Sequence, residues 1–304
     1  MSIQNFIKSP LNYTWWKYKL LPQLFSIFPE KFWTFVDLFC WWVNVWVNVN
    51  ANKIICTDKQ DQLIRIFEVL KKNTYEESLK NIENIIEKYQ LSYSEKKGYE
   101  FYGCDSLNWL QEYNKPHFMK LRDEYNSLEG DSELKDYMLL TLIFYGFNNQ
   151  IRFNSQWGYN IPVWKRDVNW SITKNLKMFV EALREKNIEF ISTRFQDFKV
   201  PSNSFVYCDP PYYLTTASYN ENWAWTDQDE QDLLDYLKDL DSKWIKFALS
   251  NVIEHKWKTH NLLLDWIKEN NFKPNKINSN YNNSNYQKNS KKWNWSIEVL
   301  VTNY

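Results

Sequence analysis

Glycine is scarce in this chain: there are five glycines among 304 residues, against 17 tryptophans. Glycine usually makes up about 7% of a protein, so most tight turns here must be built from other residues. Lys plus Arg and Asp plus Glu are equal at 37 each, so no net charge indicates a nucleic-acid or membrane partner. Function must therefore be sought in local motifs.

Paired cysteines and clustered histidines are also missing. The four cysteines contain no CxxC pair, which argues against structural zinc and favours reduced, buried thiols. The histidines at positions 117, 255 and 260 share no ligand spacing, so we expect no metal.

No apolar run is long enough to cross a bilayer. The most apolar stretch, 35–49, is interrupted by Asp37 and two asparagines. A secretory leader is not expected, because Lys8 and Pro10 precede any apolar run. The sequence predicts a soluble cytoplasmic protein with no membrane partner and no evident obligatory protein partner.

Short β-prone runs alternate with helical patterns over much of the chain. We expect strands at 32–39, 53–56, 188–193, 205–208, 245–249 and 297–302, and helices at 60–70, 75–89, 107–147, 175–186, 227–240 and 261–268. This alternation predicts an α/β fold with a doubly wound sheet.

The helical middle of the chain breaks this alternation. We predict that residues 62–166 form an inserted lobe, and that 1–61 and 167–304 form the sheet domain. The stretch 148–166 is predicted to be a loop or hairpin. On composition, the Asn-, Ser- and Lys-rich stretch 275–292 is predicted to be a mobile loop.

The tetrapeptide Asp209-Pro210-Pro211-Tyr212 follows the apolar run 205–208 directly. Ligands of open α/β sheets bind at the carboxyl ends of strands, where this motif is expected to lie. Two prolines fix φ and hold the Pro210 carbonyl rigidly. A carboxylate and a fixed carbonyl that both accept from an aromatic amine would make its nitrogen nucleophilic, while Tyr212 stacks on the ring. We interpret all four residues as catalytic; an ordinary Pro-Pro turn is the alternative.

The sequence resembles the Dam-type, D12 class DNA adenine-N6 methyltransferases, most closely the Dam enzymes of T-even bacteriophages. The likeness rests on YTWWK at 13–17, FVDLF at 35–39, GFNNQIRFN at 146–154, VYCDPPY at 206–212 and KFALSNVIEH at 246–255. It implies a Rossmann-like methyltransferase sheet with an inserted, mostly helical DNA-recognition lobe. It also implies methyl transfer from S-adenosyl-L-methionine to N6 of an adenine flipped out of double-stranded DNA, with GATC the usual target.

The resemblance also implies which residues bind the cofactor. They are Tyr13, Lys17, Asp37, Phe39, Asp58, Phe195 and Asp209. Asp58 ends a predicted strand, which suits a carboxylate that accepts from ribose hydroxyls. Without the resemblance, a solvated turn aspartate would be an equally good interpretation of Asp58.

The residues that the resemblance assigns to DNA lie in the irregular segment before the second half of the sheet domain. They are Gln150, Arg152, Asn154, Pro162 and Arg166. Arg reads guanine and Gln or Asn reads adenine by paired hydrogen bonds. From spacing alone, a solvated polar loop remains an open interpretation.

Tryptophan stands where the family has glycine at positions 15, 16, 41, 42 and 164, and by the same comparison at 46 and 223. Glycine permits positive φ and lets the backbone approach a ligand, and tryptophan provides neither. We therefore hypothesise weakened cofactor binding in this chain and an engineered or altered sequence. The indoles could instead turn outward or pack on neighbouring helices.

Three alternatives to an active DNA methyltransferase stay open at this point. One is an inactive DNA-binding version of the fold, since the cofactor loops carry Trp in place of Gly. Another is methylation of a different planar amine, in RNA or at a protein glutamine. A dinucleotide-dependent oxidoreductase has no support because no GxGxxG occurs.

Overall fold

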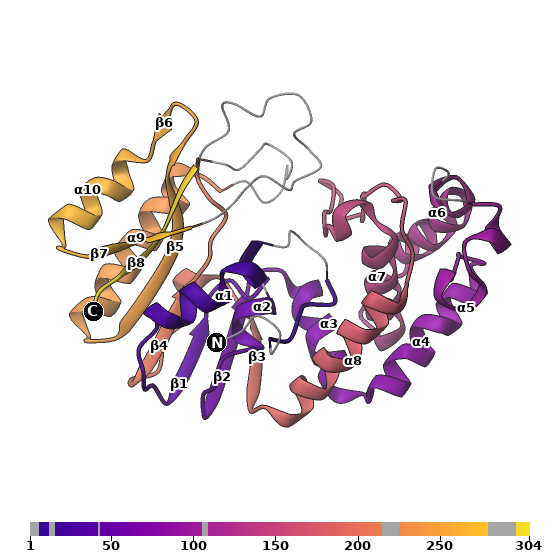
Figure 1. The fold of residues 1–304 in the computed structure, drawn as a ribbon, viewed down its shortest axis with the longest axis horizontal. Coiled ribbons are helices and arrows are strands. Elements are labelled where there is room, and N and C mark those ends of the chain that lie inside the picture. The colour runs from indigo at the N-terminus through magenta and orange to yellow at the C-terminus, as the bar shows by residue number, and fades with distance from the viewer. Residues whose placement is uncertain (1–5, 12–15, 42, 105–108, 215–224, 279–295) are drawn as a thin grey trace.

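The structure is a computed structural model that describes residues 6–11, 16–41, 43–104, 109–214, 225–278 and 296–304. Among these residues, one sheet of eight strands organises the chain (Figure 1). The strands are β1 (Thr34–Asp37), β2 (Lys53–Asp58), β3 (Ile188–Ser192), β4 (Ser204–Cys208), β5 (Lys246–His255), β6 (Lys258–Thr259), β7 (Lys273–Ile277) and β8 (Ser296–Thr302).

The strand order is β3-β2-β1-β4-β5-β8-β7, with β6 paired to β5. The first five strands in this order run parallel to one another. Strand β8 runs antiparallel between β5 and β7. The chain moves from β1 outward through β2 to β3 and then returns to β4 on the other side of β1. The order therefore reverses at β1, where open α/β sheets form a crevice.

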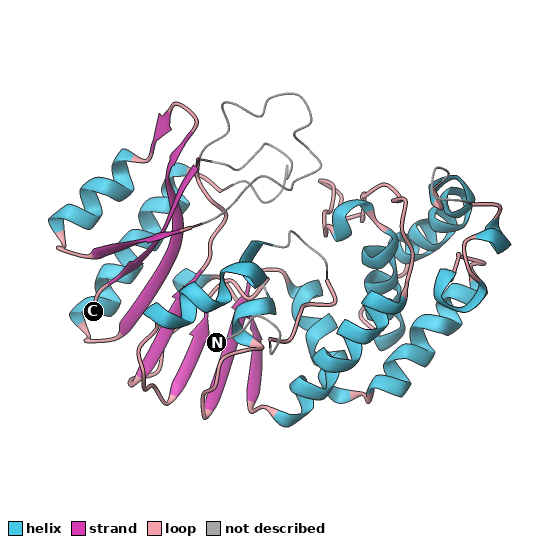
Figure 2. Cartoon of the chain, viewed as in Figure 1, coloured by secondary structure: helices cyan, strands magenta, loops and turns pink. Residues whose placement is uncertain are grey.

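Helices surround the sheet and also build a separate group beside it (Figure 2). They are α1 (Trp16–Ile27), α2 (Val43–Trp46), α3 (Asp61–Lys72), α4 (Tyr75–Lys88), α5 (Ser94–Lys97), α6 (Gln111–Ser127), α7 (Glu133–Tyr145), α8 (Trp170–Glu185), α9 (Asp227–Ser242) and α10 (Asn261–Glu269). Local sequence fixes several starts: Thr74 with Glu77, and Thr226 with Asp229, form reciprocal capping boxes at α4 and α9.

The strands bury both of their faces, as a doubly wound sheet requires. In β1, Phe35 packs in the apolar cluster that includes α1, α2, α3 and α8, while Val36 packs against the cluster that includes α9 and α10. In β4, Phe205 and Val206 divide in the same way. Successive side chains of a strand point to opposite faces, so one strand serves two hydrophobic cores. The predicted α/β fold is confirmed.

The helical group lies at the β3 side of the sheet and contains α4 to α7 (Figure 1). Helix α7 is its centre, because every side chain from Asp136 to Tyr145 is buried. The Asp167 carboxylate is buried within the group and accepts hydrogen bonds from Ser92 and Ser94. Helix α3 contacts β2 and β3 as well as α7 and α8. The domain boundaries at 62–166 stay a prediction.

Several sequence predictions are confirmed and others differ. The strands β1 to β4 and β8 and the helices α3, α4, α9 and α10 occur where periodicity indicates, within a few residues. Strand β5 continues to His255, well past its predicted end at 249, and the predicted helical stretch 107–147 is divided into α6 and α7. Helix α8 begins at Trp170, earlier than expected, because Asn169 accepts from the N–H groups of Ser171 and Ile172. The predicted mobile loop 275–292 was wrong at its start, since residues 275–277 belong to β7. Residues 279–292 of that prediction lie outside the described residues.

The four cysteines are all buried, and none of them forms a disulfide. Cys40, Cys56 and Cys208 have no measurable exposure. The interpretation of the cysteines as small buried residues is confirmed.

Gly146 ends α7 at the start of the segment that leads to the predicted DNA residues. It pairs with Val163 as an isolated bridge, while Phe153 pairs with Tyr159 farther along. A Cβ atom at Gly146 would lie 2.7 Å from the Tyr159 hydroxyl and 2.8 Å from the Leu142 carbonyl oxygen. Only glycine lets the backbone approach this closely.

Replacing Gly146 by alanine is therefore expected to overpack this corner and lower the free energy of unfolding by roughly 1–3 kcal/mol. Urea unfolding would measure the change. The matched control is Gly158→Ala, since a Cβ there meets Asn154 atoms at 3.4 Å, an ordinary contact distance. Equal stability of the two variants would contradict the expectation.

Candidate active site

Three carboxylates lie where neighbouring parallel strands end. Asp37 is the last residue of β1, Asp58 is the last residue of β2, and Asp209 follows β4 directly. Their side chains are buried: the exposed fraction of Asp37 is 0%, of Asp58 is 9% and of Asp209 is 2%. Two of these strands, β1 and β4, flank the point where the strand order reverses. The three aspartates that the resemblance assigned to the cofactor therefore all lie at the carboxyl ends of neighbouring strands.

A buried lysine from α1 connects this edge to other elements. The Lys17 ammonium nitrogen lies 3.1 Å from Asp209 Oδ1 and 2.8 Å from Glu298 Oε1 on β8. It also donates to the hydroxyls of Tyr212 and Ser250. Burial by itself lowers the pKa of Lys17, but the two carboxylates outweigh burial and raise this pKa. Lys17 therefore carries a positive charge in the protein interior.

Asp209 is held in an environment that favours its protonated form. Burial raises the pKa of Asp209 to about 6, although the positive charge of Lys17 opposes the shift. Both carboxylate oxygens are buried, and neither accepts an aligned hydrogen bond from the described residues. Most buried polar atoms have a hydrogen-bond partner, so Asp209 is suited to accept hydrogen bonds from a ligand.

Asp37 shows the same property. Its Oδ1 accepts from the Phe39 N–H at 3.2 Å, and its Oδ2 is buried without a hydrogen-bond partner among the described residues. Burial raises the pKa of Asp37 well above the usual value, and the nearby carboxylates of Asp209 and Asp58 raise it further. A cationic ligand beside Asp37 and Asp209 would relieve this repulsion.

The rest of the proline motif is partly enclosed. Pro210 is buried and Pro211 is exposed. The Tyr212 hydroxyl donates to Glu298 at 2.9 Å and lies 3.0 Å from Ser250 Oγ. Tyr212 thus contributes a hydroxyl to the Lys17 network, and its stacking on a base stays a prediction.

Sequence reasoning missed Glu298 and Ser250. Glu298 is a carboxylate within an otherwise apolar strand, and it is only 3% exposed. A charged residue at an inward position of a buried strand is the signal that would have indicated it, because such residues are almost never buried without a partner.

The other predicted cofactor residues have different surroundings. The rings of Phe39 and Phe195 lie 5.6 Å apart, and Trp225 lies 5.7 Å from Phe39 and 6.0 Å from Phe195. Burial raises the pKa of Asp58 to about 6, and its Oδ1 accepts from the Gln60 N–H. Tyr13 lies outside the described residues. The binding roles of these residues stay predictions.

Four of the five predicted DNA residues lie in the hairpin-like segment after α7. Arg152 donates to Asn160, and Asn154 Oδ1 accepts from the N–H groups of Gln156 and Gly158. These side chains therefore also hold the turn together. Of the other two residues in this segment, Gln150 is half-buried and Pro162 is exposed.

The fifth residue, Arg166, is exposed and belongs to a cationic group. Burial lowers the pKa of Lys8, and the positive charges of Arg166 and Lys19 lower it further. A polyanionic ligand would relieve this repulsion.

The tryptophans at expected glycine positions have different surroundings. Trp46 is fully buried against Phe67, Phe179 and Phe190, and its indole N–H donates to the Cys40 carbonyl at 2.9 Å. Trp164 stacks on Phe147 at 4.1 Å, and Trp41 is half-buried beside the core. The side chains at 15, 16, 42 and 223 lie outside the described residues.

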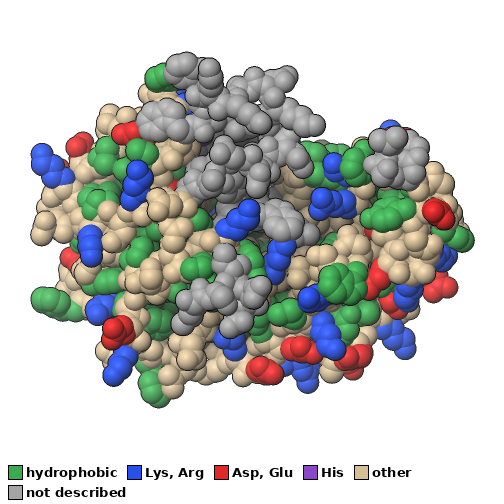
Figure 3. Space-filling view, in the orientation of Figure 1, with side chains coloured by type: hydrophobic (Ala, Val, Ile, Leu, Met, Phe, Trp, Pro, Cys, Tyr) green, Lys and Arg blue, Asp and Glu red, His purple; other side chains and the backbone are tan. Residues whose placement is uncertain are grey.

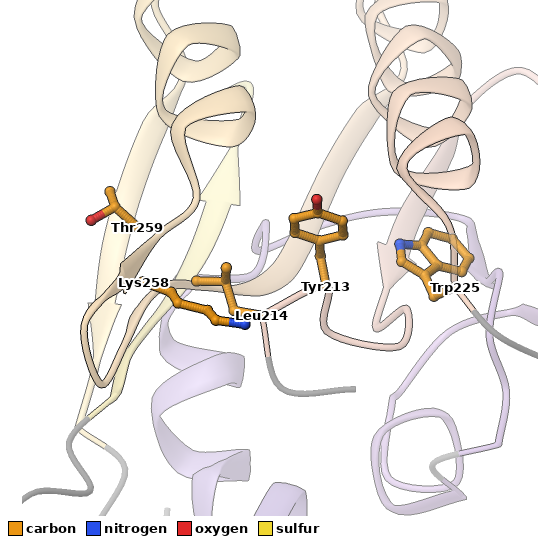
Figure 4. A pocket seen from close by; sticks show the side chains of 5 residues that line it. All are labelled: Tyr213, Leu214, Trp225, Lys258 and Thr259. Atoms are coloured by element: carbon orange, nitrogen blue, oxygen red, sulfur yellow. The ribbon is translucent and has the colours of Figure 1, made fainter. Parts of the chain in front are cut away.

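A pocket of about 520 Å³ opens beside the proline motif (Figure 4). It is lined by Tyr213, Leu214, Trp225, Lys258 and Thr259. Two aromatic rings and one lysine suit a planar ligand that also carries negative charge.

The described residues offer neither a metal site nor a membrane-spanning helix. They contain no group of three or more His, Cys, Asp and Glu residues that could hold a metal ion. Within the same ranges, no helix is long and apolar enough to cross a membrane.

Comparison with known proteins gives one family. Residues 13–282 match the family described as D12 class N6 adenine-specific DNA methyltransferases. The chain is 40% identical over 309 residues to the Type II methyltransferase M.FokI of Planomicrobium okeanokoites, covering 99% of this chain and 43% of the relative. It is 35% identical to the modification methylase StsI of Streptococcus sanguinis, covering 100% and 44%.

The modification methylase LlaI of Lactococcus lactis subsp. lactis is 33% identical, with 98% of this chain and 43% of the relative covered. The chain therefore spans less than half the length of these relatives. These names support the wider family that the sequence motifs indicated, whereas the narrower likeness to T-even phage enzymes gains no support from them.

Replacing Lys17 by an uncharged residue tests whether its charge stabilises the two buried carboxylates. Lys17→Met leaves Asp209 and Glu298 as buried carboxylates without their cation, and we expect a loss of about 3–5 kcal/mol in the free energy of unfolding. The double variant Lys17→Met/Glu298→Gln should regain part of this loss.

Denaturant unfolding measures both effects. Lys53→Met is the control, because Lys53 and Glu189 form a pair whose side chains are 40% and 47% exposed, and such surface pairs contribute at most about 1 kcal/mol. A Lys17 variant as mild as the Lys53 variant, or a double variant less stable than Lys17→Met, would contradict the network.

Proposed function

Since the chain belongs to the D12 class N6 adenine-specific DNA methyltransferases, we propose that it transfers a methyl group from S-adenosyl-L-methionine to N6 of adenine in double-stranded DNA. One observation carries the proposal. The buried carboxylate of Asp209 stands at the reversal point of the sheet, where it forms an ion pair with Lys17 and neither oxygen accepts an aligned hydrogen bond from the described residues. GATC, expected from the family resemblance, is the first target sequence to test.

The residues present suit the cofactor. S-adenosyl-L-methionine supplies a methyl group on a positively charged sulfur and also carries an ammonium group. The partnerless Oδ2 of Asp37 and the oxygens of Asp209 are buried acceptors that fit such a cation. Phe39, Phe195 and Trp225 offer aromatic faces of the kind that an adenine ring stacks on.

The chain's part in the chemistry is to prepare the adenine nitrogen. Its lone pair is delocalised into the ring, so it is a weak nucleophile. An ionised Asp209 accepts one N–H of the amino group and the Pro210 carbonyl accepts the other, which draws the nitrogen toward a nucleophilic geometry. Asp209 must be ionised for this role, and Lys17 favours the ionised form.

The DNA side of the proposal rests on the cations and the hairpin-like segment. Figure 3 shows Lys and Arg side chains near the middle of the displayed face, between the sheet and the helical group. We propose that Lys8, Lys19 and Arg166 contact phosphates, which positions the duplex without reading its sequence. Gln150, Arg152 and Asn154 are proposed to read bases.

The second candidate is a DNA-binding protein of the same family without activity. It follows from the tryptophans at positions 15, 16, 41 and 42, where the family has glycine. Restoring glycine at these four positions and measuring cofactor affinity by calorimetry separates the two candidates. Ordinary affinity before the change would remove the inactive version.

Asp209→Asn should reduce methyl incorporation into unmethylated duplex DNA by at least about 100-fold, because an amide presents a donor to the amine and loses the charge. In the unchanged protein, the rate should fall as pH drops through about 6, since the raised pKa of Asp209 leaves half of this carboxylate protonated at that pH. Tritiated methyl transfer from S-adenosyl-L-methionine measures both.

The control is Asp265→Asn, an exposed carboxylate on α10, which should leave the rate unchanged. Full activity of Asp209→Asn would overturn the assignment of Asp209. DNA retention without incorporation by the unchanged protein would favour the inactive version.

A further inference from the structure

Another buried carboxylate, Glu230, lies outside the Lys17 network. It sits in the first turns of α9 with an exposed fraction of 0%. Three side chains donate to it: Asn251 at 3.0 Å and His260 at 2.9 Å on Oε1, and the Trp225 indole at 2.5 Å on Oε2. Nothing in the sequence motifs or in the proposed chemistry accounts for this arrangement.

The proton on His260 can be placed from its partners. His260 precedes α10, and its Nδ1 accepts the backbone N–H of Leu263 at 3.3 Å. An accepting Nδ1 carries no proton, so Nε2 holds the proton and donates it to Glu230. Glu230 thus orients the imidazole ring while the start of α10 fixes its other side.

Two side chains that contact Glu230 or His260, Trp225 and Tyr213, line the pocket in Figure 4. Trp225 is bound to Glu230 directly, and its ring contacts Phe39 and Phe195. Tyr213 follows the proline motif, and its ring lies over the His260 imidazole at 5.0 Å. A hydrogen bond to Asp227 raises the pKa of the Tyr213 hydroxyl. The tyrosine is therefore held at its ring and at its hydroxyl.

We propose that Glu230 is a positioning residue that sets Trp225 on the cofactor side of the site and, through His260, sets Tyr213 beside the proline motif. This inference rests on the proposed methyl transfer, because it assigns Trp225 to the cofactor and Tyr213 to the segment that holds the target amine. Glutamine cannot replace Glu230, because its amide offers one acceptor oxygen where three donors converge.

Glu230→Gln should weaken S-adenosyl-L-methionine binding by about tenfold in calorimetry and also lower kcat. Trp225→Phe, which removes only the indole N–H, should weaken binding without the same loss of kcat. The double variant should bind no more weakly than Glu230→Gln, because both changes interrupt one interaction. Glu269→Gln, at an exposed carboxylate of α10, is the matched control.

A spectrum recorded without cofactor tests the position of Trp225 even if the protein does not methylate DNA. In a proton–nitrogen correlation spectrum, the indole signal assigned to Trp225 by the Phe variant should move in Glu230→Gln and stay in place in Glu269→Gln. An unmoved signal, or folded Glu230→Gln with unchanged affinity, KM and kcat, would overturn the positioning role. Absence of methylation by the unchanged protein, with the indole signal moving as expected, would count against the proposed function alone.

An independent observation concerns tryptophans in left-handed backbone. Trp157 has φ +61° and Trp244 has φ +60°. The left-handed region costs a side-chain-bearing residue roughly 1–2 kcal/mol, and bulky residues there are outliers. Trp244 is also 94% exposed, so burial of its ring returns almost nothing.

The backbone around Trp244 forms the helix ending that glycine usually occupies. At the end of α9, the Ile245 N–H reaches the Leu240 carbonyl at 3.0 Å and the Trp244 N–H reaches the Asp241 carbonyl at 2.9 Å. These two bonds define a Schellman motif with Trp244 at the left-handed position.

From these positions and the ratio of 17 tryptophans to five glycines, we infer that positions 157 and 244 carry glycine in the protein of the source organism. The codon UGA is read as tryptophan in some genetic codes and as glycine in others, which would exchange the two residues at many positions of a translated sequence. Trp225 differs from these two because its indole N–H and its ring are both used.

Mass spectrometry of the protein isolated from its source decides the matter directly. Peptides that contain residues 157 and 244 should be lighter by the mass difference between tryptophan and glycine. Tryptophan masses in both peptides would overturn the inference.

Stability supplies a second readout on the chain as printed. Trp244→Gly should raise the midpoint of thermal unfolding by roughly 2–4 °C, and Trp244→Ala should not. The control Trp170→Gly, at an exposed first residue of α8, should lower it, because glycine weakens a helix. A destabilised Trp244→Gly variant would contradict the glycine requirement.

Discussion

The buried ammonium group of Lys17 is the interaction on which the candidate site depends. It joins α1 to the turn after β4, to β5 and to β8 through Asp209, Ser250 and Glu298. Two carboxylates this close would repel each other without the cation, and the cation would be costly to bury without them. The charge balance therefore helps to fix the position of Asp209.

Much of the fold could be predicted from the sequence, because apolar periodicity is a local property. The parallel strands and the placement of Asp209 at a strand end both follow from it. Strand β7 could not be found in this way, since Lys273–Ile277 contains a proline and two lysines, which an edge strand tolerates. The meeting of Lys17 with Glu298 was equally hidden, because it depends on where β8 inserts in the sheet.

Strand β5 connects the two buried carboxylate centres. Ser250 and Asn251 are consecutive residues, so their side chains point to opposite faces of the sheet. Ser250 accepts from Lys17 on one face, and Asn251 donates to Glu230 on the other. A shift of β5 along its neighbours would disturb both centres together, whereas either centre can be altered alone through its side chains.

Because β8 lies far along the chain from α1, the Lys17 network is completed late during synthesis. Lys17 and Glu298 are 281 positions apart in the chain, and contacts between such distant residues form late because loop closure precedes them. During synthesis, Asp209 and Lys17 emerge long before the strand that completes their surroundings. A partly translated copy that has not yet reached β8 thus lacks the carboxylate that completes the Lys17 network.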